Sequence, residues 1–219
     1  MKFFWIYLQG KVLPLILHAH LHLSDPSSPG NYRPISVLSV FSKIFERIIQ
    51  QRILSFLKKQ GSILGSQYGF RRGHSTFMAI MDMVENINES WENNEYCLGI
   101  FVDFKKAFDT VDFSILFAKL QNLGIRGLPL QLIKSYFHNR HQFVSFRGVE
   151  SVLRKILVGV PQGSILGPLF FLIYINDLAR VSPLLRSILF ADDTNLFIKS
   201  KNRDNLYTLA NLELKKFSE

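Results

Sequence analysis

The stretch SILFADDTNLF, Ser187 to Phe197, places two adjacent carboxylates, Asp192 and Asp193, inside a run of sheet-forming residues. An isolated buried carboxylate is costly and two like charges repel, so such a pair is expected to be exposed, to share a proton or to bind a cation. Paired aspartates are also common in hairpin turns, where their short side chains hydrogen-bond the local backbone. The pair by itself therefore favours a turn between two short strands, and the rest of the chain decides whether it also binds a cation.

The composition is that of a folded, basic protein. Its 219 residues are 47% hydrophobic and include 20 Phe, which is enough apolar material for a core in one or two domains. Lys and Arg number 26 against 17 Asp and Glu, and the resulting net charge of +9 suits a polyanionic partner but also a basic protein without one. The single cysteine, Cys97, excludes an intramolecular disulfide framework and a multi-cysteine zinc site, and it favours a reducing, intracellular compartment.

The N-terminal segment, residues 1–25, fits poorly to a targeting signal. Its two apolar stretches are separated by Gly10 and Lys11, and neither approaches the roughly 20 residues of a spanning helix, so we expect no membrane partner. His18, His20 and His22 alternate as residues on one face of a strand do, which allows a metal site. A strand edge is the favoured interpretation of these histidines.

Apolar residues at three- and four-residue steps predict two amphipathic helices in the first half of the chain. The first spans residues 41–57 and stops before Gly61. The second follows the segment RRGHST, with Ser75 or Thr76 as its N-cap. Its apolar stripe is predicted to be core and comprises Phe77, Ile80, Met81, Val84, Ile87 and Trp91.

Strands and helices alternate further along the chain. The segment EYCLGIFVDF indicates a buried strand that ends in Asp103. Helices are predicted in VDFSILFAKLQNLG, with Asp112 as a candidate cap, and in LPLQLIKSYFHNR, with Pro129 in its first turn. A hairpin is predicted from HQFVSF and LRKILVG. A glycine-rich loop followed by an apolar helix is predicted in GVPQGSILGPLFFLIYINDL, and a final helix in RDNLYTLANLELKKF. This order predicts an α+β domain with an antiparallel sheet.

Three carboxylates stand where such a sheet would bring them together. Asp103 ends one predicted strand, Asp192 and Asp193 lie in a later hairpin, and the glycine-rich loop PQGSILG lies between them in sequence. Carboxylate oxygens are the ligands that magnesium prefers. Two divalent ions about 4 Å apart can activate an attacking hydroxyl and stabilise the leaving oxygen in a phosphoryl displacement. A two-metal site would also offset the repulsion between the adjacent aspartates.

Five blocks of the sequence, in order, resemble those of a known family. Three blocks resemble those of reverse transcriptases, specifically those of non-LTR (LINE-like, jockey-type) retrotransposons: FVDFKKAFDTVD, GVPQGSILGPLFFLIYINDL and LFADD. NYRPISVLSVFSKIFERII and QYGFRRGHST resemble the fingers blocks of the same family. The resemblance runs from about Pro26 to the C-terminus.

The resemblance implies a fold and an activity. The fold is a right-hand polymerase with a fingers-like part at residues 26–95 and a palm-like part at 96–219, whose small antiparallel sheet carries the carboxylates, after a diverged segment at 1–25. The family would continue past the final helix into a thumb, and an endonuclease would come before the fingers, so we expect a truncated fragment. The implied activity is RNA-directed DNA polymerisation in the cytoplasm and nucleus, with an RNA template, a DNA primer, dNTPs and two Mg²⁺ ions, or Mn²⁺ in their place.

The resemblance also implies roles for the acids and for one aromatic residue. Asp103 and Asp192 match the two principal metal ligands of the family, and Asp193 matches the third carboxylate beside them. Phe108 matches the bulky residue that closes the sugar pocket, where a ring would clash with a ribose 2′-hydroxyl and so select deoxynucleotides. Without its block, Phe108 would be interpreted as an ordinary core aromatic.

Four further positions match substrate-binding residues of the family. Arg71 matches a fingers arginine over the incoming triphosphate, a role suited to a planar and always charged guanidinium. Gln162 and Gly163 match the loop beside the nascent base pair, where glycine lets the backbone approach the ligand closely. Ala191 is small enough to lie near the primer end. The family commonly has lysines before the DPSSPGNYRPIS region, whereas this chain has LHAHLHLSD, so it departs from the family at a position of triphosphate or template contact.

Three functions remain open at this point. The first is the polymerase. The second is an inactive truncated remnant that only binds RNA, and the third is a maturase-like RNA-binding protein. The presence of all three acids favours the polymerase lineage.

Overall fold

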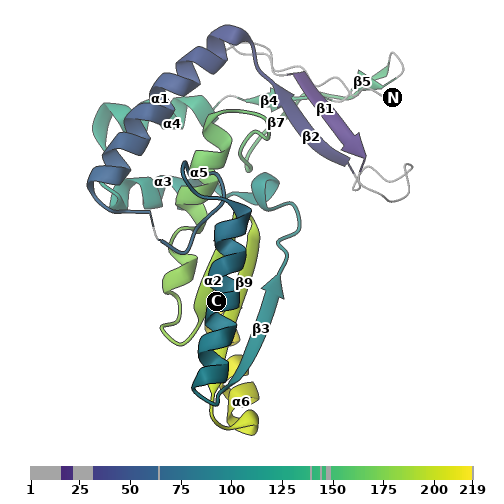
Figure 1. The fold of residues 1–219 in the computed structure, drawn as a ribbon. Coiled ribbons are helices and arrows are strands. Elements are labelled where there is room, and N and C mark those ends of the chain that lie inside the picture. Colours follow the sequence, from purple (N-terminus) through teal and green to yellow (C-terminus); the bar gives the residue numbers. More distant parts are fainter. Residues whose placement is uncertain are drawn as a thin grey trace. The chain divides into compact units, whose positions relative to one another are not determined.

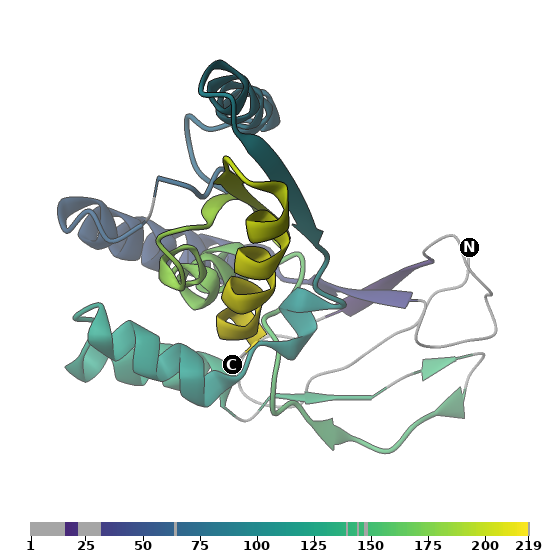
Figure 2. The same ribbon diagram turned by 90° about the horizontal axis from the view of Figure 1, so that it is seen from below.

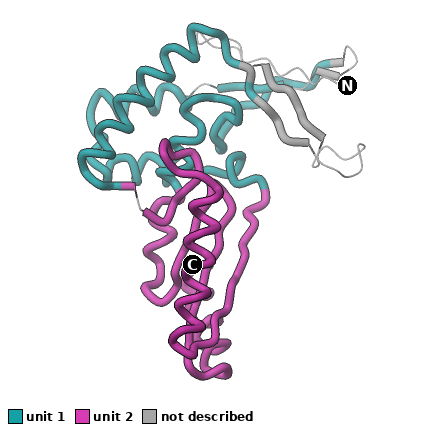
Figure 3. Tube along the Cα trace, viewed as in Figure 1, with its two compact units in different colours: residues 1–62, 106–174 teal, residues 63–105, 175–219 magenta. Residues whose placement is uncertain are grey.

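The computed structural model describes residues 16–21, 32–63, 65–138, 140–143, 145–146 and 149–218. The chain divides into two compact units, one formed by residues 1–62 and 106–174 and the other by residues 63–105 and 175–219 (Figure 3). Both units are therefore assembled from segments far apart in sequence. The predicted fingers-like and palm-like parts divide the chain by function instead, and they stay predictions.

The first unit contains most of the helices (Figure 1). Its elements are β1 (Ile16–Leu21), β2 (Tyr32–Val37), α1 (Val40–Lys59), the 3₁₀ helix η2 (Ala107–Thr110), α3 (Phe113–Asn122), α4 (Gly127–Phe137), β4 (His141–Gln142), β5 (Ser145–Phe146), β6 (Val149–Glu150), β7 (Arg154–Lys155) and α5 (Leu166–Ile175). The strands form three antiparallel pairs, β1 with β2, β4 with β7 and β5 with β6. The predicted hairpin after α4 is confirmed, as is a strand at His18 and His20, while His22 lies outside the described residues.

The core of the first unit gathers around α5. Nearly all of its residues are buried, because the helix is apolar on every side. An aromatic cluster lies against it, in which the ring centroids of Phe137 and Phe170 are 5.1 Å apart. The N-terminus of α3 is capped as predicted, since the Asp112 carboxylate accepts the backbone N–H groups of Ser114 and Ile115 at 2.7 and 3.0 Å. No helix in the described part of the chain is both long and apolar enough to cross a bilayer.

The second unit is a three-stranded antiparallel sheet with helices on both faces. Its elements are α2 (Thr76–Glu92), β3 (Tyr96–Val102), η3 (Leu178–Arg180), β8 (Arg186–Phe190), β9 (Asp193–Ser200) and α6 (Arg203–Ser218). The strand order is β3-β9-β8. The predicted α+β class with a small antiparallel sheet is confirmed.

Alternate residues of β9 face opposite helices, as the period of a strand requires. Phe197 packs with Ala79 of α2, whereas Leu196 and Ile198 pack with Leu206 of α6. Figures 1 and 2 show α2 and α6 on either side of this sheet. Both faces of the central strand are therefore buried, which explains the apolar run around the acid pair.

Two burial predictions were wrong. The strand β3 is an edge strand and none of its residues is fully buried, because β9 pairs with it on one side only. The apolar stripe predicted as core on α2 is exposed: its members Phe77 and Trp91 are 68% and 82% exposed. The side of α2 that meets the sheet carries smaller residues instead, including Ala79 and Ser90, which allow the helix to approach closely.

Candidate active site at the end of the three-stranded sheet

The acid pair lies in a tight hairpin turn. Phe190 of β8 and Asp193 of β9 form the last pair of the ladder, so Ala191 and Asp192 are the two turn residues. Ala191 has a φ of +57°, the left-handed conformation that two-residue hairpins require and that usually selects glycine. The turn predicted from the aspartates is therefore present, and the sheet places their carboxylates at its end.

Asp103 is brought to the same end of the sheet by the pairing of β3 with β9. Val102 pairs with Thr194, so the next position along each strand is Asp103 and Asp193. These two residues are exposed and line one cavity of about 310 Å³, together with residues of α2 and β8. Asp192 is half-buried in the adjoining turn and does not line this cavity.

The three aspartates suit magnesium by their chemistry, because all of their candidate ligand atoms are carboxylate oxygens. Within the described ranges, no three His, Cys, Asp or Glu side chains are grouped closely enough to hold a metal ion. The sheet brings Asp103 and Asp193 to one cavity, and Asp192 lies in the adjoining turn. The resemblance implies Asp103 and Asp192 as the principal ligands, and that assignment stays a prediction.

The segment that contains Arg71 runs along β8. The backbone N–H of Tyr68 donates to the Leu189 carbonyl, and the Leu189 N–H donates to the Ser66 carbonyl, both at 2.8 Å. Arg71 donates from its guanidinium to the carbonyl oxygen of Gln67 at 2.8 Å, and burial lowers the pKa of this guanidinium. Arg71 is therefore held on the unit that carries the three aspartates.

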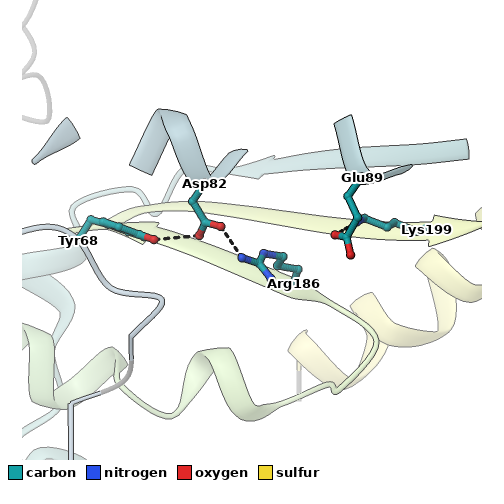
Figure 4. Close-up of polar contacts among 5 residues, drawn as sticks. All are labelled: Tyr68, Asp82, Glu89, Arg186 and Lys199. Atoms are coloured by element: carbon teal, nitrogen blue, oxygen red, sulfur yellow. Dashed lines mark hydrogen bonds and ion pairs between the residues drawn. The ribbon is translucent and has the colours of Figure 1, made fainter. Parts of the chain in front are cut away.

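A polar network fixes α2 to the strands of this unit (Figure 4). Asp82 of α2 accepts the Tyr68 hydroxyl at 2.9 Å and pairs with Arg186 of β8. Burial, followed by the hydrogen bond to Asp82, raises the pKa of the Tyr68 hydroxyl. On β9, Lys199 pairs with Glu89 at 2.7 Å and lowers the pKa of that carboxyl. These acids join α2 to the sheet, so we assign them a structural role.

Phe108, the predicted sugar-selecting residue, lies in η2 of the first unit. Its ring stacks on Phe171 of α5 with centroids 4.3 Å apart and an interplanar angle of 23°. Its carbonyl oxygen accepts the backbone N–H of Val160 at 2.8 Å. At Gly159 the backbone passes so close to η2 that an added Cβ would lie 2.7 Å from the Asp109 carbonyl oxygen. The stack and the backbone contact hold the Phe108 ring in one place.

The predicted loop residues Gln162 and Gly163 also belong to the first unit. The Gln162 side chain donates to the Asp109 carboxylate at 2.8 Å, and the Gln162 backbone carbonyl oxygen accepts the N–H of Ser36 at 2.6 Å. Gly163 is exposed and has a φ of +87°, which favours glycine there. The loop is closed by Ser164, whose hydroxyl donates to the Pro161 carbonyl at 2.8 Å. Gln162 is thus fixed by two contacts.

Sequence reasoning passed over two residues that contact these segments. Glu46 of α1 is 2% exposed and binds the backbone at the start of α5, just after the PQG loop. Gln67 is also 2% exposed and contacts the turn at Ala191. Both lie inside the fingers blocks quoted above, where neither residue has a role implied by the resemblance. The buried face of α1 carries Glu46, Ile53 and Leu57 and differs from the predicted apolar stripe, so the helical pattern gave no signal for Glu46.

Comparison with known proteins gives a consistent result. The sequence pattern of the family described as "Reverse transcriptase (RNA-dependent DNA polymerase)" matches residues 23–217. The probable RNA-directed DNA polymerase from transposon X-element of Drosophila melanogaster is 39% identical in an alignment over 196 residues that covers 86% of this chain and 21% of that protein. The RNA-directed DNA polymerase from mobile element jockey of the same fly is 34% identical in an alignment over 194 residues that covers 85% of this chain and 21% of the relative. The chain therefore spans about a fifth of the length of these relatives.

Solved structures of telomerases share the fold. A telomerase from Candida tropicalis, truncated from its C-terminal domain, matches with a TM-score of 0.61 at 15% identity, over 86% of this chain and 44% of that one. A telomerase from Candida albicans in complex with a fragment of telomeric RNA matches with a TM-score of 0.58 at 17% identity, over 98% of this chain and 40% of that one. At such low identity these likenesses concern the fold alone.

Proposed function

Because the chain belongs to the reverse transcriptase (RNA-dependent DNA polymerase) family, we propose that it is the fingers and palm of a non-LTR retrotransposon polymerase. In this proposal it joins deoxynucleotides to the 3′-hydroxyl of a DNA primer on an RNA template. The observation that carries the proposal is the placement of Asp103 and Asp193 on one cavity, with Asp192 in the adjoining turn. The net charge of +9 supports a nucleic-acid partner.

In the proposed site, Asp103 and Asp193 on the cavity and Asp192 in the adjoining turn would supply carboxylate oxygens to two Mg²⁺ ions, or Mn²⁺ in their place. Such ions, when bound, activate the attacking hydroxyl and stabilise the leaving oxygen. The exposure of the Asp103 and Asp193 carboxylates supports this role, because both can exchange water for a metal ion. Asp193 begins β9 and Asp103 directly follows β3, and strands hold a site more precisely than loops do.

The resemblance supplies the remaining assignments, each to a residue on its own unit. We assign the triphosphate to Arg71, the sugar to Phe108, the templating base pair to Gln162 and Gly163, and the primer end to Ala191. The stacking of Phe108 on Phe171 supports its assignment, because a steric block must not move aside when a 2′-hydroxyl approaches. The fixed position of the Gln162 side chain supports a role for its loop in shaping the site. We propose an intracellular location, in the cytoplasm and nucleus, in keeping with the single cysteine.

The test is extension of a DNA primer on an RNA template with Mg²⁺. The chain is assayed alone and in a longer protein in which it is followed by the corresponding C-terminal segment of the jockey relative. Asp103→Asn and Asp192→Asn should each abolish extension by the longer protein while leaving its thermal unfolding unchanged. Asp204→Asn, which alters an exposed acid of α6, is the matched control and should extend normally. Near-normal extension by Asp103→Asn would show that the site is assigned wrongly, and RNA binding without extension in the longer protein would favour the remnant or the maturase-like alternative.

A further inference from the structure

One side chain holds both backbone polar groups of Ala191. The Gln67 side-chain oxygen accepts the Ala191 N–H at 3.1 Å, and the Gln67 side-chain nitrogen donates to the Ala191 carbonyl at 3.4 Å. The same oxygen accepts the N–H of Gly69 at 2.8 Å. Gln67 is buried, so these groups do not compete with bulk water for their partners. The Gln67 amide therefore pairs with the turn much as a neighbouring strand would.

Ala191 needs such support because of its conformation. Its φ of +57° places an L-residue with a Cβ in the left-handed region, where the Cβ comes too close to the following carbonyl oxygen. Strained residues of this kind persist only where their surroundings over-determine them. The Ala191 carbonyl also shares a rigid, planar peptide unit with the N–H of Asp192. Holding that carbonyl therefore fixes the peptide plane from which Asp192 begins.

Gly69 lies directly against the backbone of the same turn. A Cβ built on Gly69 would overlap the backbone nitrogen of Ala191 and lie 2.9 Å from the Phe190 carbonyl carbon. Real side chains do not approach backbone so closely, so any larger residue at Gly69 must displace the turn. Gly65, four residues earlier in the same segment, has no atom within 4 Å of such a Cβ. In this segment, therefore, glycine is required at position 69, which contacts the turn, and not at position 65.

We propose that Gln67 and Gly69 are positioning residues that set the direction of the Asp192 and Asp193 carboxylates and so tune their affinity for a divalent metal ion. The inference rests on the proposed function, because it takes those carboxylates as metal ligands. Residues that orient ligands without touching the metal commonly change metal affinity by about 10- to 100-fold when they are mutated. We expect a loss of that size when the Gln67 amide is removed or when the turn is displaced at Gly69.

The probe is Mn²⁺, titrated into the 219-residue chain and followed by electron paramagnetic resonance. Gln67→Leu removes the amide at similar volume, and Gly69→Ala adds the overlapping methyl group. Each should weaken Mn²⁺ binding by about 10- to 100-fold. The matched controls are Gly65→Ala in the same segment and Gln121→Ala at an exposed position of α3, and both should bind as the unmodified chain does.

A rescue experiment separates positioning from general stability. Ala191→Gly lets the turn adopt a positive φ without strain, so it should restore part of the Mn²⁺ affinity lost in Gln67→Leu. It should not rescue Gly69→Ala, because the added methyl group still meets the backbone of Ala191 and Phe190. Hydrogen exchange of the Ala191 amide, measured without metal, should speed up in Gln67→Leu and stay unchanged in Gly65→Ala.

The outcomes distinguish this inference from the proposed function. If Asp103→Asn and Asp192→Asn bind Mn²⁺ like the unmodified chain, the metal site itself is assigned wrongly. If those two variants lose binding but a folded Gln67→Leu or Gly69→Ala keeps normal affinity, the positioning role is overturned. Should Gln67→Leu not fold, Gly69→Ala and the double variant Gln67→Leu with Ala191→Gly carry the same test. If Ala191→Gly restored Mn²⁺ affinity equally in Gln67→Leu and in Gly69→Ala, that result would also contradict the positioning role.

Discussion

Glu46 accepts the backbone N–H of Ile165 at 2.7 Å, and the same carboxylate oxygen accepts the N–H of Leu166 at 3.2 Å. Its other oxygen accepts the hydroxyl of Tyr136 at 2.7 Å. One buried acid of α1 thereby joins α4 to the first residues of α5, where the helix dipole also favours negative charge. The contact fixes the point at which the PQG loop enters its helix.

Replacing Glu46 should destabilise the first unit strongly. Glu46→Ala leaves two backbone N–H groups and one hydroxyl without their acceptor, and a hydrogen bond to a charged group contributes about 1.5–3 kcal/mol. We expect a loss of about 3 kcal/mol or more in the free energy of unfolding, measured with urea. Glu92→Ala, at an exposed position of α2, is the control and should change it little. A loss for Glu46→Ala no larger than for Glu92→Ala would contradict the assignment.

The partner of Glu46 gives the protein a pH dependence in alkaline solution. Burial, reinforced by the Glu46 carboxylate, raises the pKa of Tyr136 above its ordinary value of 10.0. In the unfolded chain this hydroxyl ionises first, so the folded state holds more protons above about pH 10 and its stability falls as the pH rises. Below about pH 10 the contribution is fully present.

Tyr136→Phe should remove that dependence. The difference in unfolding free energy between the unmodified chain and Tyr136→Phe should be constant from about pH 7 to pH 9 and shrink above about pH 10. Urea unfolding at several pH values measures it, and subtracting the two proteins cancels the other titrating groups. Tyr207→Phe, at an exposed position of α6, is the control. A difference that grows with pH would reverse the expected sign and refute the explanation.

The local structure was predictable wherever neighbouring residues decide it. The cap of α2 follows from Ser75, whose hydroxyl oxygen accepts the Met78 N–H at 3.3 Å, and the hairpin follows from the aspartates between two apolar runs. The contacts that support the site were not predictable, because they join distant positions. Gln67 and Ala191 are 124 residues apart, and Glu46 and Ile165 are 119 apart. The spacing of apolar residues within one segment cannot predict a contact between two such distant residues.

The candidate site itself was predictable only in part. An acid at the end of a strand and an acid pair in a hairpin indicated that carboxylates would meet at one end of a sheet. Which of them share a cavity depends on the register of β3 against β9, where Val102 pairs with Thr194. A shift of one residue would exchange the faces on which the side chains lie. The sequence leaves that register open. Only the structure shows that Asp193, and not Asp192, is the neighbour of Asp103 across the two strands.

Sugar selection tests the assignment of Phe108. If its ring blocks a 2′-hydroxyl, Phe108→Val in the longer protein should raise ribonucleotide incorporation relative to deoxynucleotide incorporation. The variant also loses the stack on Phe171, which costs about 0.5–1.5 kcal/mol beyond the buried area, so some loss of thermal stability is expected. Competing ribonucleotides against deoxynucleotides in single-turnover extension measures the selection. Phe117→Val, which disturbs a different aromatic contact of the first unit, should lose stability without changing the ratio. An unchanged ratio in Phe108→Val would mark that residue as a core aromatic.

The last prediction separates RNA binding from polymerisation. Binding along a phosphate backbone comes largely from counterion release, which needs only surface charge such as the net +9 of this chain. Polymerisation demands more, because the primer hydroxyl must be held in a near-attack position, and a misplacement of about 1 Å can cost about 100-fold in rate.

We therefore expect the 219-residue chain to bind primed RNA and to lose about tenfold or more in affinity between about 50 and 200 mM salt, yet to extend the primer poorly. If the C-terminal segment of the jockey relative holds the duplex, as the thumb implied by the resemblance would, its addition should raise extension while the salt dependence stays steep. Titration of labelled primer-template at several salt concentrations, run beside the extension assay, measures both properties. Robust extension by the chain alone would show that the added segment is dispensable. Binding that ignores salt would show that the positive charge serves another purpose than phosphate contact.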